Sequence, residues 1–195
     1  MATQPLSSAV KLPRLGTIKI GEPMGVSEPS GATKTGSETY ADGTVRDQYR
    51  FDGLFGPSSD RFSRSEHPDG SVNVQLTFRA SGAGLFNELG RVMGWPNALA
   101  NIAVKPDGRV STISLEVPDP KHAGVSHGVE IFDHNSDGAP DEVIQTRTTA
   151  GLPFAPPKEV LSRSLVDTNF DGLPDTVKGP RIEKSPFESG DWLVP

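Results

Sequence analysis

Alternation of apolar and polar residues predicts half-buried β-strands in the middle of the chain. Segment 71–80, SVNVQLTFRA, carries an apolar residue at every second position, and segment 109–118, RVSTISLEVP, alternates from Ile113 to Val117 before Pro118. A period of two is typical of a strand that turns one face to a core. We therefore expect two strands here, the second ending at its proline.

Turn signals separate these strands from their neighbours. Asp-Gly pairs, which favour tight hairpins, stand at 42–43, 69–70 and 107–108. Near the carboxyl end, GVEIF and EVIQTRT flank residues 133–141, while LV and TVKGPRI flank residues 167–175 as a weaker pair. The pattern predicts antiparallel, hairpin-rich β-structure.

One segment favours a helix. In GLFNELGRVMGW, apolar residues recur at the helical period until Gly94 and Pro96 end the pattern. We expect a short amphipathic helix near 84–94. Its apolar stripe is more typical of a plug against a sheet than of a binding groove.

The ends of the chain differ in composition from its middle. Residues 1–39 are rich in Pro, Gly, Ser and Thr, with one strand-like island, LGTIKI, so we expect an extended arm carrying one strand. Residues 40–128 should form a β-rich domain, and residues 129–195 a β-hairpin region packed with it as one domain. The expected fold is mainly antiparallel β with one short helix, arranged as a sandwich or barrel.

Composition narrows the function classes. Glycine and proline (21 and 18 of 195 residues) argue against long helices, and an apolar fraction of 34% predicts a modest core. The net charge of −6, without any long basic run, disfavours nucleic acid as a partner. The chain contains no cysteine, so disulfides cannot hold it together. No segment predicts a membrane span or a classical signal peptide.

Two nine-residue stretches nearly repeat each other. DHNSDGAPD at 133–141 and DTNFDGLPD at 167–175 share Asp, Asn, Asp, Gly, Pro and Asp at identical spacing. Aspartate, asparagine, glycine and proline are also ordinary turn formers, so a metal-free hairpin is the simpler alternative. Six identities at fixed spacing nevertheless favour a shared chemistry.

The spacing fits calcium, which takes about 6–8 oxygen ligands. Side chains at the first, third and fifth positions turn inward, the sixth-position glycine permits the reversal, the seventh residue offers its carbonyl, and the ninth closes the shell. The predicted ligands of two Ca²⁺ sites are Asp133, Asn135, Asp137, Ala139 and Asp141, and Asp167, Asn169, Asp171, Leu173 and Asp175. An EF-hand is disfavoured, because Ile144 and Lys178 stand where its twelfth-position glutamate belongs.

Both stretches resemble the D-x-[DN]-x-D-G-x-x-D loops of bacterial calcium-binding repeats, the FG-GAP and VCBS families, and more distantly thrombospondin type 3 and dockerin loops. The resemblance covers the two loops and their flanking strands. It implies calcium-braced repeats in surface, adhesive, secreted or toxin-associated proteins. A propeller is not expected, because two copies cannot close one and a propeller blade is longer than their separation.

No catalytic constellation is evident. His67, His122, His127 and His134 form no metal-binding motif, and we interpret 122 and 127 as solvated loop histidines. Ser, His and Asp lie close together within 51–69, without a nucleophile elbow, and the glycines of 81–90 lack the lysine of a phosphate-binding loop. We expect a protein that is not an enzyme.

Aromatic residues leave a second kind of site open. Trp95, Trp192, Phe51, Phe55, Phe62 and Tyr49 are candidates for a sugar-stacking platform, although such side chains more often fill a core.

The leading hypothesis is a calcium-binding structural or assembly protein of a bacterial surface, an extracellular filament or a virion, self-associating through its N-terminal arm. The alternative is a secreted calcium-dependent binding module or adhesin fragment that recognises a glycan or a surface protein. A hydrolase accessory or toxin-associated domain is a third possibility.

Overall fold

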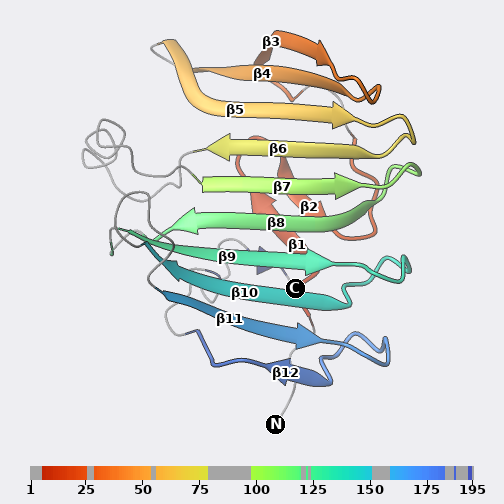
Figure 1. The fold of residues 1–195 in the computed structure, drawn as a ribbon, viewed down its shortest axis with the longest axis vertical. Helices are drawn as coiled ribbons and strands as arrows, with labels where there is room; N and C mark the ends of the chain where they lie inside the picture. Colours follow the sequence, from red (N-terminus) through yellow and green to blue (C-terminus); the bar gives the residue numbers. More distant parts are fainter. Residues whose placement is uncertain are drawn as a thin grey trace.

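Ten antiparallel strands form one large sheet (Figure 1). The computed structural model describes residues 6–25, 29–53, 56–78, 98–119, 122, 124–150, 159–182, 187 and 193–194. The helix expected near 84–94 lies outside the described residues. The sheet's strands are β3 (Ala32–Thr39), β4 (Val45–Gly53), β5 (Gly56–Glu66), β6 (Val72–Phe78), β7 (Ala98–Val104), β8 (Val110–Pro118), β9 (Val125–Phe132), β10 (Glu142–Thr149), β11 (Glu159–Val166) and β12 (Thr176–Lys178).

The sheet is a meander in which spatial order follows chain order from β3 to β12. Neighbouring strands run antiparallel, so every second connection lies at the same end of the sheet. Five hairpin turns therefore line the right-hand side of Figure 1. Each contains an Asp-Gly pair whose glycine has a positive φ; these glycines are Gly43, Gly70, Gly108, Gly138 and Gly172. The first three turns are short, and the last two are the nine-residue loops.

A second sheet covers one face of the first. It consists of β1 (Ala9–Leu12), β2 (Gly16–Lys19) and β13 (Leu193–Val194) in the order β13-β1-β2. Figure 1 shows β1 and β2 behind the central strands. The molecule is thus a two-layer, sandwich-like β-structure, which confirms the expected fold class.

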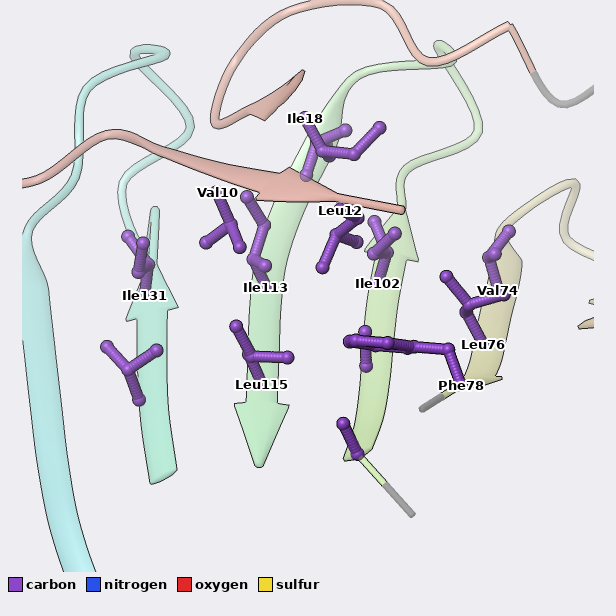
Figure 2. Packing of buried hydrophobic residues seen from close by; sticks show 14 of the residues in the cluster. Val10, Leu12, Ile18, Val74, Leu76, Phe78, Ile102, Ile113, Leu115 and Ile131 are labelled. Atoms are coloured by element: carbon purple, nitrogen blue, oxygen red, sulfur yellow. The ribbon is translucent and has the colours of Figure 1, made fainter. Parts of the chain in front are cut away.

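The core lies between these two layers. Val10, Leu12 and Ile18 of the small sheet pack toward Leu76, Phe78, Ile102, Ile113, Leu115 and Ile131 of the large one (Figure 2). All are buried. Burying one such side chain contributes about 1.5–3 kcal/mol, so this seam supplies much of the stability. The alternation seen in the sequence is confirmed, since inward residues of β6 and β8 are buried and their neighbours are more exposed.

Residues 1–39 depart from the expected arm with one strand. Their described part contains β1, β2 and β3, and the hairpin β1–β2 folds back on the chain's own sheet. The reason is burial: Val10, Ile18 and Ile20 are 0–8% exposed there, which offsets the entropy of ordering the segment. The large sheet also runs without a break across the boundary expected at residue 129, so the two regions form one structural unit. Among the described residues, no helix is long and apolar enough to cross a membrane.

Candidate metal-binding loops

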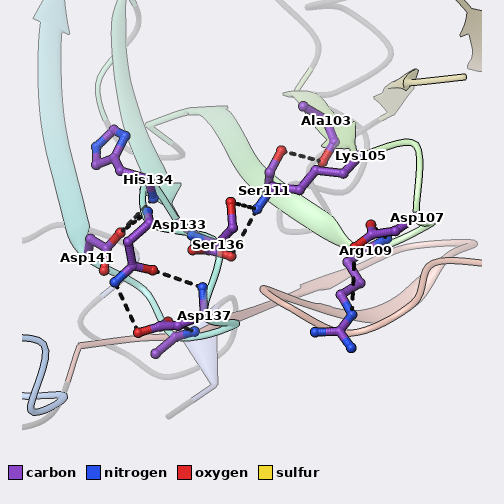
Figure 3. A network of polar contacts seen from close by, with 12 residues as sticks. Ala103, Lys105, Asp107, Arg109, Ser111, Asp133, His134, Ser136, Asp137 and Asp141 are labelled. Carbon is purple, nitrogen blue, oxygen red and sulfur yellow. Dashed lines mark hydrogen bonds and ion pairs between the residues drawn. The ribbon is translucent and has the colours of Figure 1, made fainter. Parts of the chain in front are cut away.

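The first loop joins β9 to β10 and begins at a buried aspartate (Figure 3). The side chain of Asp133 is only 2% exposed, and its Oδ1 accepts a hydrogen bond from the backbone N–H of Ser136 at 2.6 Å. Its own N–H donates to the carbonyl of Ser111 on β8 at 3.0 Å. The first predicted ligand is therefore a fixed anchor at the base of the loop.

The second loop joins β11 to β12 and begins in the same way. Asp167 is 3% exposed. Its Oδ1 accepts hydrogen bonds from the N–H groups of Phe170 (2.8 Å) and Asp171 (3.3 Å), and its Oδ2 accepts one from Gly172 (2.6 Å). One carboxylate thus orders three consecutive peptide groups.

The middle of each loop brings the third and fifth positions into contact. Asn135 Nδ2 lies 3.0 Å from Asp137 Oδ2, and Asn169 Nδ2 lies 3.2 Å from Asp171 Oδ2. The fifth-position carboxylates also accept hydrogen bonds from the N–H groups of the seventh residues, Ala139 (2.8 Å) and Leu173 (2.9 Å). Two predicted ligand side chains are therefore neighbours in both loops.

The ninth position closes each loop onto its beginning. Asp141 Oδ2 accepts hydrogen bonds from the N–H groups of His134 (2.6 Å) and Asn135 (3.0 Å). Asp175 Oδ2 does the same with Thr168 (2.9 Å) and Asn169 (3.1 Å). The Thr168 hydroxyl also donates to this carboxylate at 2.7 Å, and these hydrogen bonds, led by that of the hydroxyl, lower the pKa of Asp175 below its usual 3.8.

Both loops adopt the same unusual backbone. The fourth residues, Ser136 (φ 71°) and Phe170 (φ 61°), share left-handed conformations with the sixth-position glycines, Gly138 (φ 92°) and Gly172 (φ 84°). A non-glycine residue in this region costs about 1–2 kcal/mol. The hydrogen bonds that the first-position carboxylates accept from the two fourth-residue N–H groups offset that cost.

A lysine distinguishes the first loop from the second. Lys105 extends from the β7–β8 turn, and its Nζ lies 3.3 Å from Asp133 Oδ2 and 2.7 Å from Ser136 Oγ. An ammonium thus stands beside the first predicted ligand. The lysine is 28 residues away from Asp133 along the chain, and the repeated loop sequence does not predict this contact.

The loops contact each other and the N-terminal segment. The N–H of Asp167 donates to the carbonyl of Asp141 at 2.9 Å. Gly21, which follows β2, lies directly against the backbone of Gly138, and the N–H of Leu6 approaches the carbonyl of Gly172 at 3.4 Å. The small sheet is therefore attached to both loops.

The donor set fits a hard cation in kind, because each loop offers three carboxylates, one amide and nearby backbone carbonyls within nine residues. The carboxylates are nevertheless engaged with backbone N–H groups. Across the described part of the chain, no three His, Cys, Asp or Glu side chains converge as a metal-binding group. Each carboxylate has two oxygens with two lone pairs apiece, so it can accept these N–H groups and still offer oxygen to a cation.

Two histidines expected to be solvated share a carboxylate instead. His127 Nε2 lies 3.1 Å from Asp119 Oδ2, and His122 Nδ1 lies 3.2 Å from Asp119 Oδ1. The interpretation as a loop residue is wrong for His127, which is 1% exposed because it belongs to the inward-facing set of β9. His122 is exposed, as expected. The alternation of Val125, His127 and Val129 was the signal for this burial.

The aromatic platform is also wrong for its described members. Phe51, Phe62 and Tyr49 are 0–5% exposed, and the rings of Tyr49 and Phe62 meet edge to face. They fill the core, as apolar rings do when aliphatic residues are scarce. The remaining members, Phe55, Trp95 and Trp192, lie outside the described residues, as do residues 81–90.

No family model, curated protein or solved structure matches the chain.

Proposed function

We propose that the chain is a calcium-binding structural module in which the two nine-residue loops act as metal-dependent staples. The observation that carries this proposal is the duplicated geometry: two segments 34 residues apart (133 and 167) repeat the same anchors, contacts and left-handed residues. Reversing the chain does not by itself require two matching nine-residue loops. The three short Asp-Gly turns at the same end of the sheet reverse the chain with fewer residues.

A cation at these loops would relieve electrostatic repulsion. Asp137, Asp141, Asp171 and Asp175 place four carboxylates on two adjoining loops of a chain whose net charge is −6. Like charges on neighbouring loops repel one another, and a bound divalent ion would offset that repulsion. Because most of the ligand positions are exposed, we expect weak sites of the extracellular kind, with Kd on the order of 10⁻⁴–10⁻³ M.

We infer that such a module works outside the cell, on a bacterial surface, an extracellular filament or a virion. A cysteine-free chain has no disulfides to secure it there. Calcium loops would take over that task.

We further propose that the chain self-associates through β3, the last strand of residues 1–39, rather than through the β1–β2 hairpin that precedes it. The β1–β2 hairpin is engaged with the chain's own sheet, whereas β3 forms an edge of the large sheet and is exposed along nearly its whole length. An edge strand presents unpaired backbone groups to another chain.

The test is calcium-dependent stability. Melting temperature and calorimetric heats are measured across 0–10 mM Ca²⁺ for the native chain and for a variant carrying Asp137→Ala and Asp171→Ala. Calcium is expected to raise the melting temperature of the native chain by a few degrees, following RT ln(1 + [L]/Kd), and to leave the variant unchanged. Absence of both heat and stabilisation at millimolar calcium overturns the proposal.

A second candidate, a secreted binding module, is favoured by a polar hollow on the open face of the sheet.

A further inference from the structure

The face of the large sheet that β1 and β2 do not cover carries a shallow hollow of about 360 Å³. Its lining comes from β4 to β8, and includes Arg46, Ser63, Asn73, Gln75, Asn101 and Ser114. These residues alternate with the buried side chains of the core, which places them on the opposite face. Figure 1 looks onto this face.

The floor of the hollow is a continuous polar row. Ser63, Gln75, Asn101 and Ser114 are direct cross-strand partners on β5, β6, β7 and β8. Gln75 Nε2 donates to Asn101 Oδ1 at 3.0 Å. With strands about 4.8 Å apart, the row spans roughly 14 Å. That is the length of a short oligomer rather than of a single small molecule.

Room for a ligand comes from a small residue. Ala103 separates Asn73 on β6 from Thr112 on β8 in the neighbouring cross-strand row. Because the alanine methyl group is short, it leaves an empty space between the longer side chains around it, and this space is the hollow.

Arg46, at one end of the hollow, is the only charged side chain among the described lining residues. Arg46 Nη2 lies 3.4 Å from Ser63 Oγ, while its Nε is buried and has no hydrogen-bond partner in the described part of the chain. The guanidinium is the cationic donor group of the lining, and an arriving oxygen anion can accept hydrogen bonds from it. Glu38, the cross-strand neighbour of Arg46 on β3, is exposed and lies outside the lining.

We infer that this hollow binds an acidic oligosaccharide, with the carboxylate of one sugar on the Arg46 guanidinium and the hydroxyls of its neighbours on the row of amides and hydroxyls. Three features favour this class. The lining offers one cation, several neutral hydrogen-bond partners and, within the described residues, no carboxylate, in a chain of net charge −6. A hydroxyl-rich anion matches that combination, whereas an apolar ligand would leave the amides unpaired.

This inference goes beyond the proposed function and does not rest on calcium binding at the loops. The probe is a tetrasaccharide of galacturonate, titrated into ¹⁵N-labelled protein in chelator and again in 5 mM Ca²⁺. The side-chain NH₂ signals of Asn73, Gln75 and Asn101 are expected to shift in both buffers. A galactose tetrasaccharide and inorganic sulfate at equal ionic strength serve as the neutral and the anion-only probes, and both are expected to bind at least tenfold more weakly.

Variants locate the binding determinants. Arg46→Gln is expected to weaken binding about tenfold to a hundredfold, as for loss of a hydrogen bond to a charged group. Arg109→Gln, at an exposed arginine on the β7–β8 turn, is expected to change affinity less than twofold. Glu38→Gln, which removes the carboxylate next to Arg46 on the neighbouring strand, is expected to strengthen binding.

The amide shifts of the native chain decide the matter even if a variant fails to fold. Unmoved amide signals at millimolar tetrasaccharide, equal binding of the neutral sugar, or equal losses in Arg46→Gln and Arg109→Gln would each overturn the inference. Binding only in calcium would also contradict it, because the hollow would then depend on the loops. Failure here with calcium stabilisation intact leaves the proposed function standing.

Discussion

The two nine-residue loops repeat one sequence but have different neighbours. In the first, Asp133 divides its oxygens between the Ser136 N–H and the ammonium of Lys105. In the second, Asp167 uses both oxygens for backbone N–H groups. The first loop lies between β8 and the second loop and is pressed by Gly21, while the second lies next to the sheet edge at β12.

The repeated nine residues therefore determine the backbone shape of each loop, whereas the residues around the loop determine which groups neutralise its anchor carboxylate. Both backbones share the same left-handed residues, because the same carboxylates accept hydrogen bonds from the same N–H positions within each set of nine residues. Among the described residues, only the first loop has a cationic side chain, Lys105, paired with its first-position aspartate. We therefore expect the second loop to depend more strongly on an external cation.

The contact at Gly21 is where a substitution should disturb the first loop most. Its φ of 73° disfavours a side chain, and a Cβ would overlap the backbone of Gly138. Gly21→Ala is expected to cost about 3 kcal/mol, combining left-handed strain with a steric clash, and to lower the melting temperature by roughly 6–12 °C.

Gly16→Ala is the matched control. Gly16 has a nearly identical φ of 75°, and no atom lies within 4 Å of the place that an added methyl group would take, so only the strain of about 1 kcal/mol applies. Equal losses in the two variants would show that the small sheet does not press on the first loop.

Lys105→Met tests the difference in charge balance between the loops and should have an intermediate effect. In chelator, removal of the ammonium leaves the buried Asp133 carboxylate without its cation and is expected to cost about 2 kcal/mol of unfolding free energy. In calcium, the first loop should gain affinity about tenfold, because the ion no longer competes with lysine. Urea unfolding and calorimetry measure the two effects.

Lys19→Met is the control for this variant. Lys19 pairs with Glu22 at 3.1 Å, and both side chains are well exposed, so its loss should change stability little. A Lys105→Met protein that is as stable as Lys19→Met, with unchanged calcium affinity, would remove the proposed difference between the loops.

Acid titration of the short turns gives the smallest expected effect. The Thr44 N–H lowers the pKa of Asp42, and the Ser71 hydroxyl followed by its N–H lowers the pKa of Asp69, both from 3.8. A lowered folded pKa means that the stabilisation is fully present above pH 3.8 and is lost as pH falls through the folded values.

The double variant Asp42→Asn, Asp69→Asn should therefore be less stable than the native chain at pH 5–7 and equal to it near pH 2. Melting curves in chelator across this range provide the measurement. A difference that widens below pH 3.8 would show the opposite linkage.

Much of the fold was predictable because its determinants are local. Alternation identified strands of the meander, and the Asp-Gly pairs identified its turns. The burial of His127 follows from its place in the alternation of β9, whereas histidine as a residue type is more often partly exposed. The packing of the β1–β2 hairpin onto the chain's own sheet could not be predicted, because short apolar runs do not reveal what they pack against.

The shape of both loops is determined largely within their own nine residues, since the hydrogen bonds that their carboxylates accept from loop N–H groups join residues no more than 7 positions apart. Three other features arise only when the strands assemble: Lys105 reaches Asp133 from 28 positions away, Gly21 rests on Gly138, and five strands present a polar hollow. Local hydrogen bonds depend on spacing along the chain, whereas these contacts depend on the order and register of the strands in the sheet.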